Sequence, residues 1–341
     1  MHMADALISP AVGVAMWAAT AGLIGYSAKK VKDEGEDRKI PLMGVLGAFI
    51  FAAQMINFSI PATGSSGHLG GGMILTILLG PYAAFLVMAS VLTVQALFFA
   101  DGGLLALGCN IFNLGFFPCF IAYPFIYKKI VGKNFTQIRI ATGGIIIAAI
   151  VSLQLGAFGV VLETVFSGIS ELPFRTFVLL MQPIHLAIGI VEGIITAAVV
   201  TFVWKARPEI LNAAPESISI GKVAMKKVLL GLVVVTAITG GALSWFASSN
   251  PDGLEWSMAK TSGKEELESS EKIHASLADI QEKTAFLPDY GFKKSEPETS
   301  ENPAWPAVDY GTSVSGLIGG ALTLVLAVLI GIVLKRRKIN S

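Results

Sequence analysis

The chain has 341 residues, of which 53% are hydrophobic and only 14% are charged, and its net charge is +1. Soluble globular proteins carry about 25% charged residues, so this composition excludes a soluble enzyme and predicts an all-α integral membrane protein. The small net charge implies no attraction to nucleic acid. The two cysteines, Cys109 and Cys119, are too few for a disulfide framework or a cysteine-rich metal site.

Apolar runs long enough to cross a bilayer follow one another along the chain. They cover residues 8–27, 41–60, 82–100, 107–127, 138–160, 183–204, 228–246 and 315–334, with a shorter run at 73–80 before Gly80-Pro81. Counting the shorter run as a helix gives nine crossings. We expect about seven helices in residues 1–206, a polar cytoplasmic linker at 207–224, and two helices in residues 225–341.

The positions of lysine and arginine predict the orientation of these helices. Basic residues cluster at 29–39, 128–139, 205–227 and 335–338. Cytoplasmic loops carry an excess of such residues, so we place all four clusters inside. The N-terminus is then outside and the C-terminus cytoplasmic, in a multi-pass protein of a prokaryotic inner (plasma) membrane. The long loop 248–312, which holds 13 of the 24 acidic residues, is then external and partly ordered.

The amino terminus has the chemistry of a metal chelator. No Lys or Arg precedes Lys29, so no signal peptide is apparent and Met1 is expected to remain. The α-amine of Met1, the His2 amide nitrogen and the His2 imidazole can close adjacent chelate rings in one plane around a metal ion. Ni(II) and Cu(II) accept such a plane best, and Co(II) can follow. His68, in a glycine-rich loop on the same predicted side, would supply the fourth nitrogen.

Each of these features also has an ordinary structural interpretation. A histidine stands at position 2 by chance in many proteins, and a loop histidine is more often plain polar surface. The residues that could support a ligating imidazole by hydrogen bonds or backbone geometry are Gln54, Asn57, Gly67, Asp101 and Asn110. Their amides and carboxyls could equally bond between membrane helices.

The two remaining histidines are weaker candidates. His185 and Glu192 are seven residues apart and fall on one stripe of a predicted helix. An ionisable pair inside a membrane is a functional hypothesis, although we favour a packing pair that anchors two helices. His274 lies among Glu271, Lys272 and Asp279, which is typical of solvated surface.

Several sequence blocks resemble a known transporter family. The blocks are Met1-His2-Met3, FAAQMINFSIPATGSSGHLGGG (51–72), LLGPYAAFLVMASVLTVQALFFADGGLLALGCNIFN (78–113) and HLAIGIVEGIITAAVVTF (185–202). Together they resemble the CbiM/NikM family, the substrate-binding membrane (S) components of energy-coupling-factor (ECF) transporters for nickel and cobalt. The resemblance covers about residues 1–210. The segment NPDGLEWS (250–257) looks like the small CbiN/NikN (PDGLE) component, fused here to the first.

The resemblance implies a helical bundle with the N-terminus inserted from outside. It implies a square-planar Ni²⁺ or Co²⁺ site, where the ion is the transported substrate, made by Met1, His2 and His68. It also implies partners, namely a transmembrane coupling (T) subunit and ATPase (A) subunits. This agrees with the sequence, which contains no Walker A motif and no HExxH motif, so we expect no enzyme in this chain. The family often has an acidic residue before glycine after Met-His, whereas this chain has Met3-Ala4-Asp5-Ala6.

The favoured function is therefore metal capture for ATP-driven uptake. The alternative is a stand-alone, ion-coupled secondary metal carrier, which His185, Glu192 and Asp101 would support. A lone carrier would transport without ATPase subunits. The residues do not decide between nickel and cobalt, although four planar nitrogens suit low-spin Ni(II) slightly better.

Overall fold

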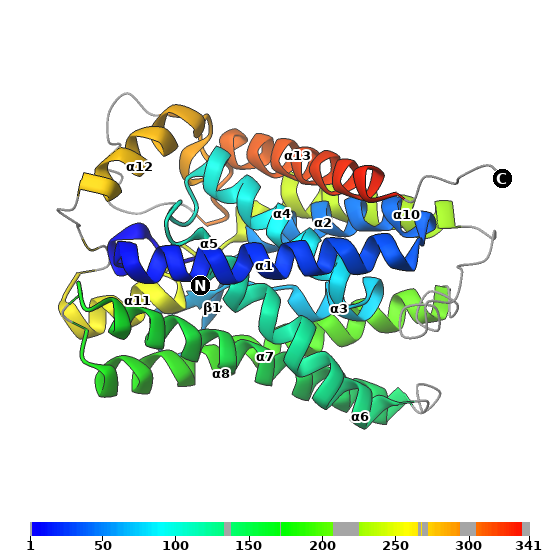
Figure 1. Cartoon of the computed structure of the whole chain (residues 1–341), viewed down its shortest axis with the longest axis horizontal. Helices are drawn as coiled ribbons and strands as arrows, with labels where there is room; N and C mark the ends of the chain where they lie inside the picture. Colours follow the sequence, from blue (N-terminus) through cyan, green and yellow to red (C-terminus); the bar gives the residue numbers. More distant parts are fainter. Residues whose placement is uncertain are drawn as a thin grey trace.

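The computed structural model describes residues 2–132, 138–170, 172–206, 225–264, 267, 272–293 and 305–335. Met1 and the predicted linker 207–224 lie outside the described residues. Most of the described chain is helical, and the long helices run side by side along the longest axis of the molecule (Figure 1).

The N-terminal part is a bundle that begins with the short η1 (Asp5–Leu7). Its further helices are α1 (Pro10–Glu34), η2 (Asp37–Lys39), α2 (Ile40–Gln54), α3 (Gly72–Leu79), α4 (Pro81–Phe99), α5 (Leu107–Ile111), the π-helix η3 (Phe112–Tyr127), α6 (Lys128–Val131), α7 (Ile138–Ser167) and α8 (Phe174–Ala206). A two-stranded antiparallel sheet, β1 (Phe58–Ile60) and β2 (Ser65–Gly67), lies between α2 and α3.

The C-terminal part adds two apolar helices and the segment between them. Its elements are α10 (Met225–Gly241), η4 (Leu243–Phe246), α11 (Gly253–Ser262), α12 (Lys272–Thr284), η5 (Pro288–Tyr290) and α13 (Tyr310–Leu334). Both α10 and α13 contact α2, so the two parts form one bundle. Where α10 and α13 cross, a Cβ added to Gly240 would lie 3.0 Å from the carbonyl carbon of Gly316. Only glycine permits so close an approach of two backbones.

The prediction of nine crossings is not confirmed. Six described helices are long and apolar enough to span a membrane, and α2 is a shorter apolar helix of 15 residues. The run 73–80 forms α3, whose eight residues extend about 12 Å, far less than the bilayer core of about 30 Å. The run 41–60 is also not a single helix, because α2 ends at Gln54 and residues 58–60 form β1.

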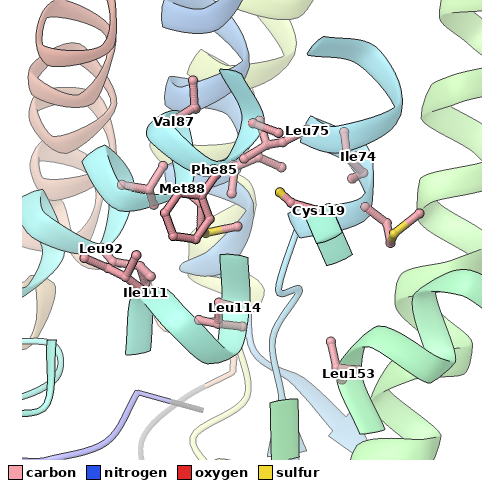
Figure 2. Close-up of a cluster of buried hydrophobic side chains, with 14 of the residues drawn as sticks. Ile74, Leu75, Phe85, Val87, Met88, Leu92, Ile111, Leu114, Cys119 and Leu153 are labelled. Carbon is pink, nitrogen blue, oxygen red and sulfur yellow. The ribbon is translucent and has the colours of Figure 1, made fainter. Parts of the chain in front are cut away.

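A glycine and a proline explain the break between α3 and α4. Gly80 has φ 84°, a conformation that ends α3, and Pro81 occupies the first turn of α4, where its missing N–H costs nothing. Short α3 therefore ends inside the bundle. The side chains around it, including Ile74, Phe85 and Leu114, form the buried apolar core (Figure 2).

The segment between α10 and α13, predicted as a partly ordered external loop, has well-defined structure in its described residues. Helix α11 contacts α8 and β2, and α12 contacts α4. Figure 1 places both helices at the end of the bundle where α1 begins. At the opposite end, the Lys335 Nζ atom lies 3.2 Å from Asp37 Oδ2, next to the connection between α1 and α2.

Candidate metal centre

The first residues of the chain are fixed inside the protein. Met3 is fully buried. The Asn110 side chain accepts from the Met3 N–H at 2.8 Å and donates to the Met3 carbonyl at 3.2 Å, and Gly103 N–H donates to the same carbonyl at 2.9 Å. Asn110 thus bonds to the backbone of the residue after His2 and not to the side chain of a candidate ligand.

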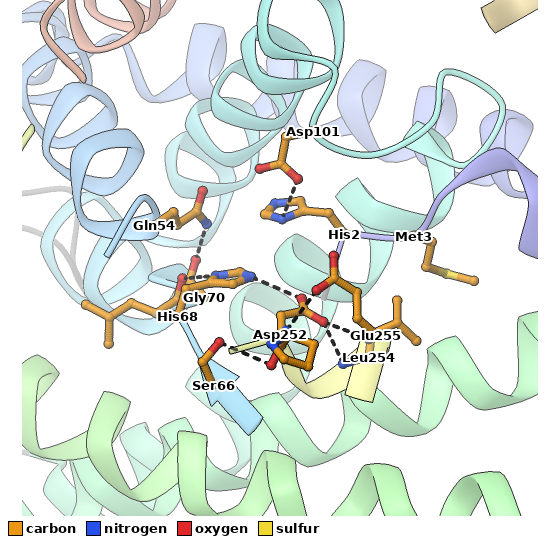
Figure 3. Close-up of polar contacts among 12 residues, drawn as sticks. His2, Met3, Gln54, Ser66, His68, Gly70, Asp101, Asp252, Leu254 and Glu255 are labelled. Carbon is orange, nitrogen blue, oxygen red and sulfur yellow. Dashed lines mark hydrogen bonds and ion pairs between the residues drawn. The ribbon is translucent and has the colours of Figure 1, made fainter. Parts of the chain in front are cut away.

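His2 is buried beside Asp101. Its Nδ1 lies 3.2 Å from Asp101 Oδ1, and its Nε2 has no hydrogen-bond partner among the described residues. Burial lowers the pKa of His2 to about 3, so its imidazole is neutral at physiological pH. In this arrangement Nδ1, the nitrogen that an N-terminal chelate would use, faces a carboxylate (Figure 3).

His68 stands next to His2 although the two residues are far apart in the sequence. Their ring centroids are 5.0 Å apart and the rings are within 10° of parallel. His68 Nδ1 lies 3.0 Å from the carbonyl oxygen of Leu69, which can only accept, so Nδ1 carries the proton and Nε2 bears the lone pair. Burial also lowers the pKa of His68 to about 3. The fold therefore brings two neutral imidazoles together.

The backbone around His68 is held by buried polar side chains. Gln54 Nε2 donates to the Gly70 carbonyl at 2.8 Å, and Gln95 Nε2 donates to Gln54 Oε1 at 2.9 Å. Gly67 is in β2, where a Cβ would lie 2.4 Å from Ile188 Cγ1. Gln54 and Gly67 thus position the loop. Of the two roles that the sequence allowed for Gln54, the structure shows the bond between membrane helices, from α4 to α2.

His185 and Glu192 do not bond to each other in the described structure. Glu192 accepts hydrogen bonds from the N–H groups of Gly70 and Gly71 at 2.8 and 3.1 Å. His185 Nδ1 donates to the Met181 carbonyl at 2.8 Å, one turn earlier in α8. Glu192 therefore supports the His68 loop, while His185 bonds within its own helix. Both side chains are buried and bonded to backbone groups, but each packs separately and not as a bonded pair.

Two further expectations are corrected. His274 is 5% exposed and its Nε2 donates to the Ile8 carbonyl at 2.9 Å, so it is not solvated surface. It is buried because α12 folds over the N-terminal segment, which its local sequence does not reveal. Asn57 lines the cavity described below, and its backbone carbonyl accepts from Ser248 N–H at 2.7 Å. Among the described contacts, Asn57 joins the two parts of the chain and makes no bond to an imidazole.

Sequence reasoning missed the contribution of Asp252. Asp252 begins α11 as its N-cap, with Oδ1 accepting from the N–H groups of Leu254 and Glu255, and its Oδ2 lies 3.9 Å from His68 Nε2. Burial opposes ionisation, but the positive charge of the chain's amino group and the hydrogen bond from the Glu255 N–H together hold the pKa of Asp252 below its usual value. The D-x-x-E capping pattern is readable from the sequence, but its position beside His68 is not.

Tyr290 also reaches the site from the C-terminal part. Its hydroxyl donates to Asp101 Oδ2 at 2.5 Å, while Asp101 Oδ1 faces His2. The C-terminal part thus acts on both imidazoles. It supplies the carboxylate next to His68, which is Asp252, and through Tyr290 it orients the carboxylate next to His2, which is Asp101.

These residues border a cavity of about 610 Å³ between the two parts of the chain. Its lining includes three histidines, His2, His68 and His274, and five carboxylates, from Asp5, Asp101, Asp252, Glu255 and Asp289. Within the described residues, no group of three or more His, Cys, Asp or Glu side chains is arranged to hold a metal ion.

Comparison with known proteins identifies the family. Residues 2–210 match CbiM, described as the cobalt uptake substrate-specific transmembrane region, and residues 226–336 match the PDGLE domain. The chain belongs to the CbiM family. The chain also resembles a crystal structure described as a transition metal transporter, with 30% identity and a TM-score of 0.53 over 60% of this chain and 93% of that one.

Named transport proteins also match the chain, one of them over nearly its whole length. A protein named as a putative fused nickel transport protein, NikMN, of Archaeoglobus fulgidus is 33% identical over 96% of both chains. The cobalt transport protein CbiM of Sorangium cellulosum is 28% identical over 62% of this chain and 95% of its own. The fusion of CbiM and PDGLE parts thus recurs in a relative.

Proposed function

We propose that this protein captures Ni²⁺, or Co²⁺, and delivers it for uptake as the S-component of an ECF transporter. The observation that carries the proposal is the buried, near-parallel pair of neutral imidazoles from His2 and His68. They lie in the part of the chain that matches the CbiM family. The relatives named for nickel and cobalt transport suggest the same cargo.

In the proposed complex, the Met1 amine and the His2 amide nitrogen join the two imidazoles in one plane. Four planar nitrogens suit Ni(II), and deprotonation of an amide requires a strong Lewis acid. His2 Nδ1 exchanges Asp101 for the metal when the chelate forms. Gln54, Gly67 and Glu192 hold the His68 loop, and Asn110 holds the backbone next to His2, so the ligands need little reorganisation.

We also propose the membrane orientation from the positions of basic residues. Lys29, Lys128, Lys205 and Lys335 belong to clusters that the positive-inside rule assigns to the cytoplasm. The metal site, α11 and α12 then face the outside. The domain boundaries 1–206 and 225–341 are part of the same proposal, with a cytoplasmic T subunit contact and separate A subunits that hydrolyse ATP.

The test is metal binding by purified protein with an unmodified amino terminus. Calorimetry with Ni(II) and Co(II) should give tight one-to-one binding, lost in both His2→Ala and His68→Ala. Binding that survives both substitutions would contradict the proposed site. Uptake into vesicles by this chain without ATPase subunits would instead favour the secondary carrier.

A further inference from the structure

The PDGLE segment is hydrogen-bonded to the strand that precedes His68. Ser66 N–H donates to the Pro251 carbonyl at 2.8 Å, and Ser66 Oγ donates to the Asn250 carbonyl at 2.8 Å. These bonds fix residues 250–251 against β2. Asp252, the next residue, is consequently held at a defined position relative to His68 (Figure 3).

The Asp252 carboxylate has a fixed orientation. Its Oδ1 accepts from Leu254 N–H at 2.7 Å and Glu255 N–H at 2.9 Å, and Glu255 in turn caps the Asp252 N–H at 2.9 Å. This capping box leaves Oδ2 directed towards the histidine. The side chain is only 15% exposed, so little room exists for another orientation.

The separation of Asp252 Oδ2 and His68 Nε2 fits a metal ion between them. Both atoms donate electron pairs to cations, since the proton of His68 is on Nδ1. One metal–nitrogen bond and one metal–oxygen bond in nearly opposite directions together span about 4 Å, and the observed distance is 3.9 Å. Mixed imidazole and carboxylate ligands suit first-row divalent ions.

The adjoining cavity has room for an ion that still carries water. Its volume is about 610 Å³, whereas six waters at about 30 Å³ each fill roughly 180 Å³. The carboxylates that line it attract cations and repel anionic chelates. His68 and Asp252 both line this cavity, so an ion inside it can reach them.

We propose that Asp252 and His68 form a loading site, in which a hydrated divalent ion is first held between the Asp252 carboxylate and His68 Nε2. The ion then exchanges Asp252 and its waters for His2 and the amino terminus while His68 stays bound. The exchange involves no redox step, and the protons lost from the His2 amide and the Met1 ammonium group pass to the waters released from the ion. This inference rests on the proposed planar site, whose direct ligands do not include Asp252.

The test compares Asp252→Asn and Asp252→Ser with Glu255→Gln. Asn and Ser are good N-caps and Gln preserves the capping box, so all three variants retain α11. Each removes one negative charge at the same helix start and the same cavity, but only Asp252 faces His68. Glu255→Gln therefore controls for the general loss of charge.

The measurements are stopped-flow association of Ni²⁺, its release into excess chelator, and the visible absorption of bound planar Ni(II). Because Asp252 leaves the metal before the planar state forms, removing it should slow association and release equally. We expect both rates to fall about tenfold in the Asp252 variants. Their dissociation constants should equal that of Glu255→Gln, and the absorption of their bound Ni(II) should equal that of wild type.

Other outcomes separate the two proposals. Association as fast as in Glu255→Gln would overturn the loading site while leaving the planar site intact. Faster release with a changed absorption spectrum would make Asp252 a permanent ligand and would also overturn the inference. Wild-type protein that binds no Ni²⁺ would remove the proposed function itself.

Discussion

Glu192, near the middle of α8, accepts hydrogen bonds from two consecutive backbone N–H groups, those of Gly70 and Gly71. Gly71 has φ 77°, and Gly70 is held from its other side by Gln54. One buried carboxylate thus fixes the curve of the loop that presents His68. The support comes from a helix more than a hundred residues further along the chain.

Glu192→Ala should weaken Ni²⁺ binding by about 10- to 100-fold, because both N–H groups lose their acceptor and the loop loosens. Calorimetry would measure the change. Glu163→Gln is the matched control, since Glu163 is also a buried carboxylate but accepts from Asn113 at 2.7 Å rather than from the loop. Equal losses in the two variants would point to general destabilisation of the bundle.

Tyr290→Phe should reduce metal affinity by up to about tenfold without changing the ligand set. The substitution removes only the hydroxyl that donates to Asp101 Oδ2, and with it the restraint on the carboxylate next to His2. The visible absorption of bound Ni(II) should be unchanged. A complete loss of binding would mean that Tyr290 does more than orient Asp101.

Any extension or formyl group on the Met1 amine should abolish tight binding of Ni²⁺, since it removes one of the proposed nitrogen ligands. Protein whose N-terminal tag is cleaved to leave Met1 should bind, whereas the uncleaved form should not. The intact mass of purified protein should begin at Met1, because the bulky His2 disfavours removal of methionine. Normal affinity in an N-terminally extended protein would rule out the amine ligand.

Substitution of two histidines should separate ligation from packing. His68→Ala should remove metal binding, while the fold is retained. His274→Ala should leave the metal-bound spectrum unchanged but reduce stability by about 1–3 kcal/mol, because the buried Ile8 carbonyl loses its donor. Thermal unfolding with and without Ni²⁺ would measure both effects, and metal binding lost in His274→Ala would contradict this division.

The pH dependence of binding should reflect the backbone nitrogens and not the imidazoles. Since burial holds the pKa of His2 and His68 near 3, both rings are already neutral and release no proton on binding. The amine and the amide each lose one proton on binding. The logarithm of the association constant should therefore rise by about two per pH unit below the amine pKa of about 8. A steeper rise below about pH 6.5 would show that the imidazoles titrate normally.

The amino-acid sequence determined the class of this protein. Its excess of apolar residues leaves no alternative to burial in lipid, and the Met1-His2 start with His68 was readable because chelate chemistry depends on residue type and order. The long helices α1, α7, α8 and α13 follow from apolar runs in the same way. The count of crossings could not be predicted in the same way, because an apolar run does not say whether lipid or protein surrounds it, and α3 is a short helix buried in protein.

Tertiary structure decided which polar residues meet at the site. Asp252 and Tyr290 lie in the segment between α10 and α13. Local sequence patterns there indicate a helix cap and a turn, but they do not predict which residues these side chains contact. Glu192 could equally have faced lipid, another helix or the loop, since one helical stripe is compatible with each. Long-range contacts depend on how whole helices pack, and this packing brings His68, Glu192 and Asp252 together.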